Sequence, residues 1–484
     1  MPVLQDLFSL VHRAAEYCVP LALGLQNIMF SYVVGLLAVY ALLYVMAVRP
    51  FRHRMQLHDV NVESLNDDEL YPPIALILPA YNEEAVIVDC VTTAMALDYP
   101  ALQVLVICDG PKDRTLEVLT EAFGLEPKEY RIRADINTQP VLGVWANPRY
   151  PLLTVILKEN GGKADALNVG LNAARAPLVC CCDADTLIEP DALRRLARPF
   201  WEEPLTIATA GALALTNGSS FVGSTPVARR APDNWLARIQ TVEYVRAFYF
   251  GRMGFERLGA MLLISGAFGL FNRHALASVG GYNHATQGED MELVVRLHRH
   301  FRANRRTYKV AYVPDAVAWT EAPEDLGSLK SQRQRWQRGL CETLWLHRGM
   351  MFSKNAGAPA WIGYPYFLLY ECLSPLVEVL GYLGIAVLLL AGYANWQVWM
   401  TMLTFALAAS LLSTFAALYE QQKLQPFVSK RVDLVRILSS VIAEMVAFRP
   451  LTLIWRIQAI GQFLTKKKVK WKALPRKGFD VAAK

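Results

Sequence analysis

The stretch between Asn160 and Asp191 constrains the fold of this chain more than any other part of the sequence. It begins with an Asn160-Gly-Gly turn, after which apolar positions recur at helical spacing. A short apolar run, Leu178–Cys182, then suits a strand buried on both faces, and it stops at Asp183 and Asp185. This order of turn, helix, buried strand and acidic turn is typical of an open α/β sheet, in which ligands bind at the carboxyl ends of the strands.

The spacing of Asp183 and Asp185 indicates a cation site. Two carboxylates this close repel each other unless a cation lies between them. Hard oxygen ligands at the end of a strand suit Mg²⁺ or Mn²⁺ bound to a diphosphate. A single Asp-X-Asp considered alone is equally well explained as a solvated polar loop, so the interpretation depends on the neighbouring motifs.

The composition points to a membrane. The chain has 484 residues, too many for one ordinary core, and 54% of them are hydrophobic. The net charge of +6 is modest, and basic residues gather beside apolar segments, which favours cytoplasmic membrane flanks over nucleic-acid binding. The eight cysteines have no paired spacing, so we expect small apolar side chains in a reducing compartment. The eight histidines form no zinc-binding pattern.

Residues 1–57 are expected to form an amino-terminal membrane segment. The almost uncharged run Asn27–Val48 is long enough to cross a bilayer as a helix. Arg49, Arg52 and Arg54 follow it directly, which predicts that this end is cytoplasmic and that the amino terminus lies outside. A cleaved signal peptide fits poorly because the apolar run is long and lies well inside the chain.

The end of the chain is also membrane-like. Its last apolar segment, 434–463, is interrupted by Arg449-Pro450, which predicts either a hairpin or an interfacial pair of helices. The basic residues beyond it belong in the cytoplasm by the positive-inside rule. The predicted parts are an interfacial aromatic helix (351–373), a membrane region (374–463) with spans at about 375–392 and 396–418, and a basic cytoplasmic tail (464–484).

Residues 72–350 follow a polar linker (58–71) and alternate predicted strands with predicted helices. This alternation implies a Rossmann-like, mainly parallel α/β sheet. Residues 131–151 have no clear periodicity and are expected to form an inserted loop. The first strand is followed by neither Gly-x-Gly-x-x-Gly nor a Walker-type motif, which argues against a dinucleotide or P-loop site. The predicted strands include Ile74–Leu78, Val104–Cys108, Leu153–Leu157, Leu178–Cys182, Ile207–Leu215 and Lys309–Val313.

Six motifs, in this order, resemble those of the family 2 glycosyltransferases. More narrowly, they resemble the membrane-embedded processive synthases of chitin, hyaluronan, cellulose and poly-N-acetylglucosamine. The resemblance covers roughly residues 72–350 and the flanking membrane layout. It implies a GT-A fold, a nucleotide-diphosphate sugar donor, Mg²⁺ or Mn²⁺, and an inverting mechanism. The motifs are Pro79-Ala-Tyr-Asn-Glu83, Asp109-Gly110, Gly162-Lys163, Asp183-x-Asp185, Glu289-Asp290 and Gln332-x-x-Arg335-Trp336.

The resemblance also implies roles for single residues. Asp290 would be the general base, Asp183 and Asp185 would serve the metal and the diphosphate, and Trp336 would stack on the acceptor sugar. Ser265-Gly-Ala resembles the acceptor-side segment of the family. The implied donor-side residues are Tyr81, Glu83, Asp109, Lys163, Asp183, Asp185, Gln332 and Arg335, and the acceptor-side residues are Ser265, Gly266, Glu289 and Trp336.

The chemistry of these residue types agrees with the resemblance. Attack by a sugar hydroxyl on an anomeric carbon needs a base near the hydroxyl and charge neutralisation on the departing diphosphate. A metal and an arginine can neutralise that charge, and tryptophan offers an apolar face to a pyranose ring. Each motif also has a simpler explanation. Glu289 and Asp290 could have no role beyond a favourable interaction with the dipole of the helix that they begin. Lys163 could be an ordinary solvated side chain, and the arginines could form a basic surface facing the membrane.

The predicted function is a processive β-glycosyltransferase of the plasma (inner) membrane. Its catalytic domain and carboxyl terminus would be cytoplasmic, its donor a UDP-sugar and its acceptor the growing polysaccharide within a lipid bilayer. Accessory secretion or regulatory subunits are compatible with this prediction. The alternatives are a non-processive enzyme that transfers one sugar to a lipid carrier, and a catalytically silent membrane scaffold or transporter. The Gln-x-x-Arg-Trp motif favours the polymerase, and retention of Asp183, Asp185 and Asp290 argues against the silent protein.

Some positions depart from the family pattern. Gly288 stands where many relatives carry threonine, which we expect to affect local capping more than chemistry. Arg333 and Gln334 make the register of the basic motif ambiguous. The chain has no gating loop of the cellulose-synthase kind after Trp336 and no Arg-x-x-x-Arg cyclic-dinucleotide signature, so cellulose synthase proper is disfavoured.

Three glutamates in the apolar segments suggest a path for the product. Glu371 and Glu378 would share one face of a helix if that helix continued through Pro375. Glu444 lies in the interrupted segment. Ionisable groups at membrane depth usually face a water-filled interior, which predicts that the helices line an exit path. The alternative is that the first two lie at the headgroup level and that Glu444 pairs with Arg436 or Arg449.

Overall fold

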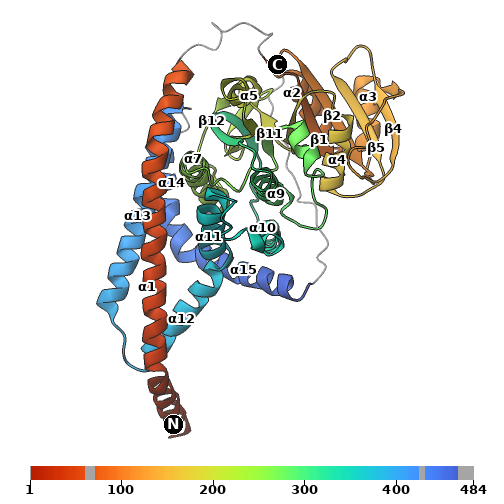
Figure 1. Ribbon diagram of the computed structural model, residues 1–484. Helices are drawn as coiled ribbons and strands as arrows, with labels where there is room; N and C mark the ends of the chain where they lie inside the picture. The colour runs from red at the N-terminus through yellow and green to blue at the C-terminus, as the bar shows by residue number, and fades with distance from the viewer. Residues whose placement is uncertain (1, 60–70, 425–430, 467–484) are drawn as a thin grey trace.

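The computed structural model describes residues 2–59, 71–424 and 431–466. The predicted linker (58–71) and basic tail (464–484) lie largely outside these residues. The described chain forms an α/β domain joined to a group of long helices that extend away from it (Figure 1). The amino-terminal end of α1 lies far from the sheet (Figure 1).

A ten-stranded sheet forms the centre of the α/β domain, with the strand order β3-β4-β5-β2-β1-β6-β11-β8-β12-β7. A separate two-stranded hairpin, β9–β10, lies outside it. The strands are β1 (Ile74–Ala80), β2 (Leu102–Asp109), β3 (Glu126–Pro127), β4 (Val141–Ala146), β5 (Leu153–Lys158), β6 (Leu178–Cys182), β7 (Leu187–Ile188), β8 (Thr206–Leu215), β9 (Ser220–Val222), β10 (Thr225–Ala228), β11 (Phe268–Asn272) and β12 (Lys309–Thr320).

The sheet is mixed, so the expectation of a mainly parallel sheet is wrong. Strands β5, β2, β1 and β6 form a parallel block, and β8 is parallel to β12. Strand β11 lies between β6 and β8 and is antiparallel to both, with Phe268 opposite Cys182. The edge strands β3 and β7, and β4 next to β3, are also antiparallel to their neighbours. The parallel block therefore corresponds to the alternating pattern of the sequence, and the remaining strands do not.

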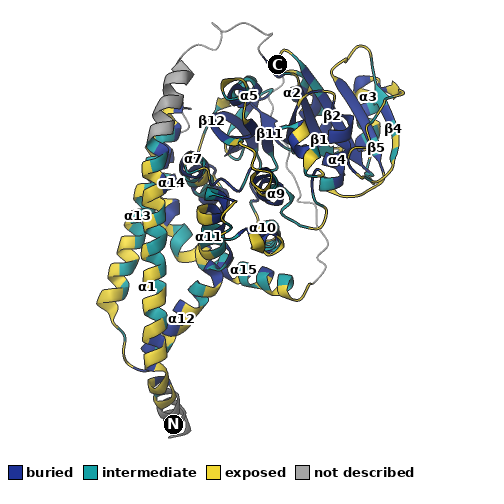
Figure 2. Ribbon diagram, viewed as in Figure 1, coloured by how far each residue is buried: buried dark blue, intermediate teal, exposed yellow. Residues whose placement is uncertain are grey.

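The predicted buried strands are confirmed where the sequence is continuously apolar. All five residues of β6 are buried, and the thiols of Cys180, Cys181 and Cys182 are free. Strands β1 and β8 are buried almost throughout, because helices cover both faces of the central sheet. Figure 2 shows the central sheet largely in the colour of buried residues.

The segment 131–151 was expected to be a loop, but it also contains a strand. It contains β4, which pairs with β5, while the short β3 just before it pairs with β4. This edge of the sheet is half-exposed, and a register shift occurs at Gly143. An exposed and irregular edge strand has weak hydrophobic alternation, which explains why its sequence lacks a clear period.

Helices of the α/β domain alternate along the chain with the strands of the parallel block, as the pattern of the sequence predicts. Helix α6 continues into a π-helical turn, η3, and then into α7. The helices are α2 (Ile87–Met95), α3 (Thr115–Phe123), α4 (Lys163–Ala173), α5 (Ala192–Glu202), α6 (Trp235–Arg246), η3 (Ala247–Gly251), α7 (Arg252–Arg257), α8 (Arg273–Ser278), α9 (Glu289–Ala303), α10 (Leu326–Leu346) and η4 (Arg348–Met350).

Three helical segments of the described chain are long and apolar enough to cross a membrane: His12–Val48, Trp396–Leu424 and Arg431–Leu464. The first is part of α1 (Pro2–Asp59), and the second is α13. Large apolar side chains on α1 and α13, including Leu21 and Phe405, remain exposed, as Figure 2 shows for the outer surfaces of these helices. Exposed apolar surface of this extent suits a lipid environment.

The segment predicted as an interfacial helix, 351–373, becomes helical only at Pro359. It comprises η5 (Pro359–Gly363), α11 (Tyr364–Tyr366) and η6 (Phe367–Cys372), and it is bent by 44° relative to α12 (Ser374–Leu390). The two bent parts together would be long and apolar enough for a fourth span. Because of this bend, Glu371 and Glu378 do not lie on one continuous helix, which was the condition for their sharing a face.

The helix is not broken at Arg449-Pro450. It runs through α14 (Arg431–Ala443), the π-helical turn η7 (Glu444–Phe448) and α15 (Arg449–Leu464). A π-helical turn rearranges the backbone hydrogen bonds just before Pro450, so the proline occupies the first turn of α15 without ending the helix. In Figure 1, α15 runs across beneath α10 rather than along α1.

Candidate active site

Three of the predicted motifs meet at one edge of the sheet. Strands β2, β1 and β6 are adjacent and parallel, so the residues that follow them, including Tyr81 and Asp183, lie at the same edge as Asp109. The turn after β1 is fixed by Asn82, whose φ is +57° and whose Oδ1 accepts the Lys112 amide at 2.8 Å. The Glu83 amide donates to Thr115 Oγ1 at 2.9 Å. These bonds hold the first motif against the loop after β2.

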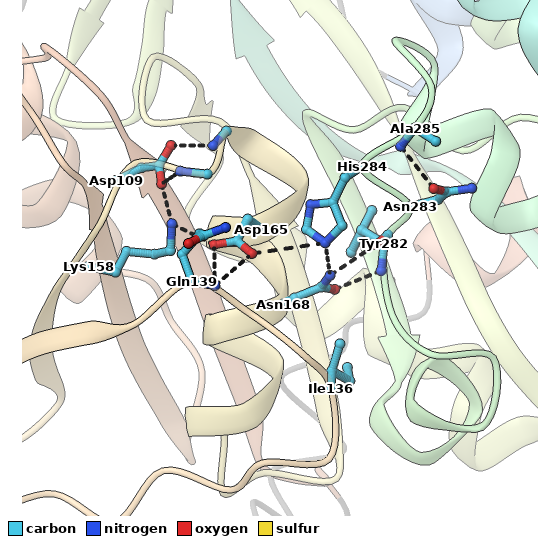
Figure 3. A network of polar contacts seen from close by, with 12 residues as sticks. Asp109, Ile136, Gln139, Lys158, Asp165, Asn168, Tyr282, Asn283, His284 and Ala285 are labelled. Carbon is cyan, nitrogen blue, oxygen red and sulfur yellow. Dashed lines mark hydrogen bonds and ion pairs between the residues drawn. The ribbon is translucent and has the colours of Figure 1, made fainter.

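Asp109 organises the glycine turn that precedes α4 (Figure 3). Its carboxylate accepts the amides of Gly161 and Gly162 at 2.9 and 2.8 Å and contacts the ammonium of Lys158. The side chain is 3% exposed. Asp109 therefore fixes the Asn160-Gly-Gly turn, and a contact between its side chain and a nucleoside stays a prediction.

Lys158 extends this network in a way that sequence reasoning missed. It is fully buried, and its ammonium lies between Asp109 and Asp165, 2.6 Å from Asp165 Oδ2. Asp165 also accepts the Gln139 amide at 3.1 Å, which ties α4 to the segment leading into β4 (Figure 3). A buried cation between two carboxylates stabilises both charges. The only signal in the sequence is a lysine directly at the end of a buried strand.

Lys163 joins the acidic turn to the start of α9. Its ammonium contacts the Asp183 carboxylate and lies 3.7 Å from Glu289 Oε1. Burial alone would lower the pKa of Lys163, but the two carboxylates outweigh it and raise the pKa well above its usual range. Burial raises the pKa of Glu289, and Lys163 opposes that rise. Lys163 is thus a positive charge held beside Asp183, and its contact with a diphosphate stays a prediction.

Asp290 is held against the acceptor-side segment predicted from Ser265 and Gly266. Its Oδ2 accepts the Gly266 amide at 3.1 Å, and its Oδ1 accepts the Met291 amide at 2.8 Å. A Cβ built on Gly266 would lie 3.3 Å from the Lys163 ammonium, so Gly266, Lys163 and Asp290 lie within a few ångströms of one another. A carboxylate fixed by two backbone amides keeps its orientation, and each oxygen still has a lone pair available for a proton.

The start of α9 lies directly against the middle of α10. A Cβ built on Gly339 would lie 2.6 Å from the Gly288 nitrogen and 2.8 Å from its Cα, so the two backbones are in contact. Glu342 of α10 accepts the Gln287 amide at 2.8 Å and strengthens this contact. The glycine at position 288, a departure from the family pattern, therefore has a packing cause.

The two arginines of the basic motif on α10 have different surroundings. Arg333 faces Glu243 and the Trp336 ring, with its guanidinium 4.7 Å from the ring centroid. The charge of Arg335, by contrast, acts on Glu289 and opposes the rise in the pKa of Glu289. Arg333 is therefore engaged by Glu243, and contact of Arg335 with a diphosphate stays a prediction. Trp336 is 42% exposed, and Gln332 Oε1 is buried without a hydrogen-bond partner among the described residues.

The predicted metal ligands fit only a partly solvated ion. Among the described residues, no group of three or more histidine, cysteine, aspartate or glutamate side chains could hold a metal ion. Asp183 and Asp185 could therefore supply one or two ligands, with water and diphosphate oxygens as the others. This is how Mg²⁺ is commonly bound with phosphorylated substrates. Asp185 itself is near Thr186, whose hydroxyl lies 3.5 Å from its Oδ1.

The glutamates of the apolar segments have partners other than those expected. Glu378 of α12 pairs with Arg449 of α15 at 3.0 Å, and Glu444 of η7 contacts the guanidinium of Arg246 at the end of α6. The alternative in which Glu444 pairs with Arg436 or Arg449 is wrong, because Glu444 pairs with Arg246. The first pair joins two carboxyl-terminal helices, and the second joins α6 of the α/β domain to η7.

The comparisons with known proteins place this arrangement in a family. The fold and the residues at the sheet edge define a glycosyltransferase with a GT-A-like mixed sheet. The profile described as glycosyl transferase family 2 matches residues 75–280, and that described as glycosyl transferase family group 2 matches residues 178–416. These matches identify glycosyl transferase family 2 domains within residues 75–416 of the chain.

Similar proteins are known by name. The chain is 31% identical over 286 residues to a poly-β-1,6-N-acetyl-D-glucosamine synthase of Staphylococcus aureus, covering 59% of this chain and 57% of the relative. It is 30% identical over 271 residues to the synthase of the same name from Staphylococcus epidermidis, covering 56% of this chain and 55% of the relative. The matched region thus spans a little over half the length of these relatives.

Among solved structures, a mannosyltransferase from Pyrobaculum calidifontis, in complex with GDP-mannose and Mn²⁺, is 16% identical with a TM-score of 0.48. That match covers 91% of this chain and 100% of the mannosyltransferase.

The structure brings part of the predicted site together. Lys163, Asp183, Gly266, Glu289 and Asp290 are linked by the contacts described above. Tyr81, Glu83 and Asp109 lie at the same sheet edge but are held by loop contacts. Sequence reasoning missed the residues that support these groups, because their partners are distant in the chain. They are Lys158, Asp165, Glu243, Gly339 and Glu342.

Proposed function

We propose that this chain is an inverting, processive glycosyltransferase that polymerises a β-linked polysaccharide from a UDP-sugar. The observation that carries the proposal is that Lys163 lies beside Asp183 and Glu289 while Asp290 is fixed by the Gly266 amide. A positive charge and a carboxylate base a short distance apart are what displacement of a diphosphate by a sugar hydroxyl requires. The names of the similar synthases make UDP-N-acetylglucosamine the first donor to test.

Each residue has a defined task in this proposal. Asp290 accepts the proton of the attacking hydroxyl, and its bonds to backbone amides keep its carboxylate in place. Lys163 and Arg335 neutralise the charge that develops on the departing diphosphate. Asp183 and Asp185 would hold a Mg²⁺ or Mn²⁺ ion, which, when bound, adds further charge neutralisation on the diphosphate. Trp336, which is partly exposed, stacks on the acceptor sugar.

We place the α/β domain in the cytoplasm and the product outside. Nucleotide sugars are made in the cytoplasm, and the basic residues that follow the apolar runs favour the same side. A polymer made there has to cross the bilayer, and the paired charges Glu378–Arg449 and Arg246–Glu444 offer polar groups along a path between the helices.

Product sizing tests the function. The purified full chain in detergent is incubated with radiolabelled UDP-N-acetylglucosamine and Mg²⁺ or Mn²⁺, with other UDP-sugars in parallel. A ladder extending to large polymer supports the proposal. A single-sugar lipid product would identify the non-processive alternative, and no transfer from any donor would identify a silent protein.

Translocation needs a separate experiment. The protein is reconstituted in sealed vesicles with active sites outward, supplied with donor outside, and treated outside with an enzyme that degrades the polymer. Product that is protected until detergent is added supports export through the protein. Complete digestion while the vesicles are intact would mean that the chain does not cross.

A further inference from the structure

Arg333 of α10 is held by a carboxylate on another helix. Its Nη2 lies 2.6 Å from Glu243 Oε2, and its Nη1 lies 3.3 Å from Glu243 Oε1. Glu243 belongs to α6, so this two-point contact joins elements that are 90 residues apart in sequence. The arginine side chain is 13% exposed and the glutamate side chain 27% exposed. An arginine held at two points has a fixed plane, which a single contact would not give.

The same guanidinium lies over the ring of Trp336, with 4.7 Å between its central carbon and the ring centroid. Arg333 and Trp336 are three residues apart on a helix, so their side chains lie on neighbouring positions of one face. On another side, Phe448 of η7 lies 5.8 Å from the guanidinium. Arg333 is thus enclosed by Glu243, Trp336 and an aromatic ring from the carboxyl-terminal helices.

This contact determines how Trp336 can move. The ring is 42% exposed, which leaves surface for a ligand while the guanidinium lies against it. A cation over an aromatic ring favours one rotamer by electrostatic attraction to the ring face. Burial raises the pKa of the Glu243 carboxyl, and the Arg333 guanidinium opposes that rise. Removing either member of the pair would therefore loosen the other and, with it, the tryptophan.

We propose that Glu243 and Arg333 are positioning residues that fix the orientation of the Trp336 ring for the acceptor sugar. This inference rests on the proposed role of Trp336 in stacking on the acceptor. It assigns Arg333 no contact with the donor diphosphate, in contrast to Arg335. The Glu243–Arg333 pair acts on acceptor binding, whereas Lys163 and Asp183 act on the donor.

The test compares acceptor kinetics of variants in the full chain. With donor saturating, the initial rate is measured against the concentration of a short N-acetylglucosamine oligosaccharide, or of an oligomer of whichever sugar the donor screen identifies. UDP affinity and melting temperature are measured on the same samples. We expect Arg333→Gln to raise the acceptor KM about tenfold, because the substitution removes both the cation–π interaction and the ion pair. UDP affinity should stay within about twofold, because Arg333 does not face the donor residues.

Two further variants separate positioning from general destabilisation. Glu243→Gln keeps the shape of the side chain and should raise the acceptor KM in the same direction but by less. In Arg333→Gln/Trp336→Ala the effect should equal that of Trp336→Ala alone, because the arginine acts through the ring. Gln334→Ala is the matched control. It lies on the same helix and removes one exposed hydrogen bond to Gln458 at 2.9 Å, so its acceptor KM should not change.

The outcomes are distinguishable. If Trp336→Ala leaves the acceptor KM unchanged, the proposed role of Trp336 fails, and the inference fails with it. If Trp336→Ala raises KM but Arg333→Gln and Glu243→Gln do not, only the positioning role is overturned. A change in UDP affinity in Arg333→Gln without a change in acceptor KM would assign Arg333 to the donor and would also overturn the inference. If Arg333→Gln has a melting temperature far below that of the wild type, the acceptor KM of Glu243→Gln decides instead. An unchanged acceptor KM in Glu243→Gln would then overturn the positioning role.

Discussion

The contact between Gly288 and Gly339 leads to a prediction whose size can be estimated from the structure. In Gly339→Ala, the added methyl carbon would lie 2.6 Å from the Gly288 nitrogen and 2.8 Å from its Cα. Ordinary contacts begin near 3.4 Å, so the backbones must separate by roughly 0.8 Å. The obstructing atoms belong to the main chain and cannot rotate away. Such overpacking typically costs about 1–3 kcal/mol of stability.

The catalytic effect should be larger than the loss of stability suggests. Gly288 directly precedes Glu289 and Asp290, and α10 carries Trp336 one helical turn before Gly339. Separating the two backbones therefore moves the proposed base relative to the acceptor site. A displacement of about 1 Å can cost on the order of 10²-fold in rate. We expect kcat of Gly339→Ala to fall about 10- to 100-fold, with a smaller change in the affinity for UDP, because Lys163 and Asp183 lie on other elements and only Gln332 and Arg335 of the proposed donor residues lie on α10.

The assay is UDP release at saturating donor, combined with UDP binding and thermal melting in the same detergent. Gly349→Ala is the matched control, since a Cβ there meets no atom within 4 Å. A wild-type kcat in Gly339→Ala would refute the idea that this contact sets the spacing of base and acceptor. Equal losses in both variants would point to a general effect of alanine in this region.

The remaining predictions concern single carboxylates. Asp290→Asn should retain UDP binding and lose roughly 10²- to 10⁴-fold in turnover, because an amide cannot accept the proton; near-normal turnover would move the base elsewhere, first to Glu289. Asp185→Ala should make UDP affinity independent of Mg²⁺ or Mn²⁺, and metal-dependent affinity in the variant would contradict this. For buried Glu292, burial would raise the pKa, but its bonds to His347 and Arg296 lower it overall. Its contribution to stability is therefore present above the ordinary glutamate pKa and is lost as the pH falls through the lower folded-state value. Thermal melts should show a smaller loss on acidification in Glu292→Gln than in the wild type; equal losses would argue against this role.

The sequence predicted those parts of the fold in which local pattern and burial agree. The continuously apolar β1, β2 and β6 are strands, and helices alternate with the strands of the parallel block as expected. The antiparallel β11 could not be predicted, since its partners are chosen by tertiary packing and not by its own five residues. The same applies to η7, where a proline that would end an isolated helix is accommodated by a π-helical turn.

In the candidate site, too, some features follow from the local sequence and others only from tertiary packing. Acidic pairs and the basic helix could be found from residue types at fixed spacing. Their supports could not, because Lys158 contacts Asp165 across a turn and Arg333 pairs with Glu243, a residue on another helix. Nothing in the local sequence around Arg333 distinguishes it from Arg335. Only the position of α6 relative to α10 does so.

The reversed direction of β11 has a consequence for how the two substrates meet. Because β11 is antiparallel to β6, its first residue, Phe268, lies beside Cys182, the last residue of β6. The turn that carries Gly266 therefore opens on the same edge as Asp183. Had β11 run with its neighbour, that turn would lie at the opposite edge, about 16 Å away across a five-residue strand. The antiparallel direction of this one strand therefore places the proposed acceptor segment at the same sheet edge as the proposed donor residues. The two substrates can then meet at that edge.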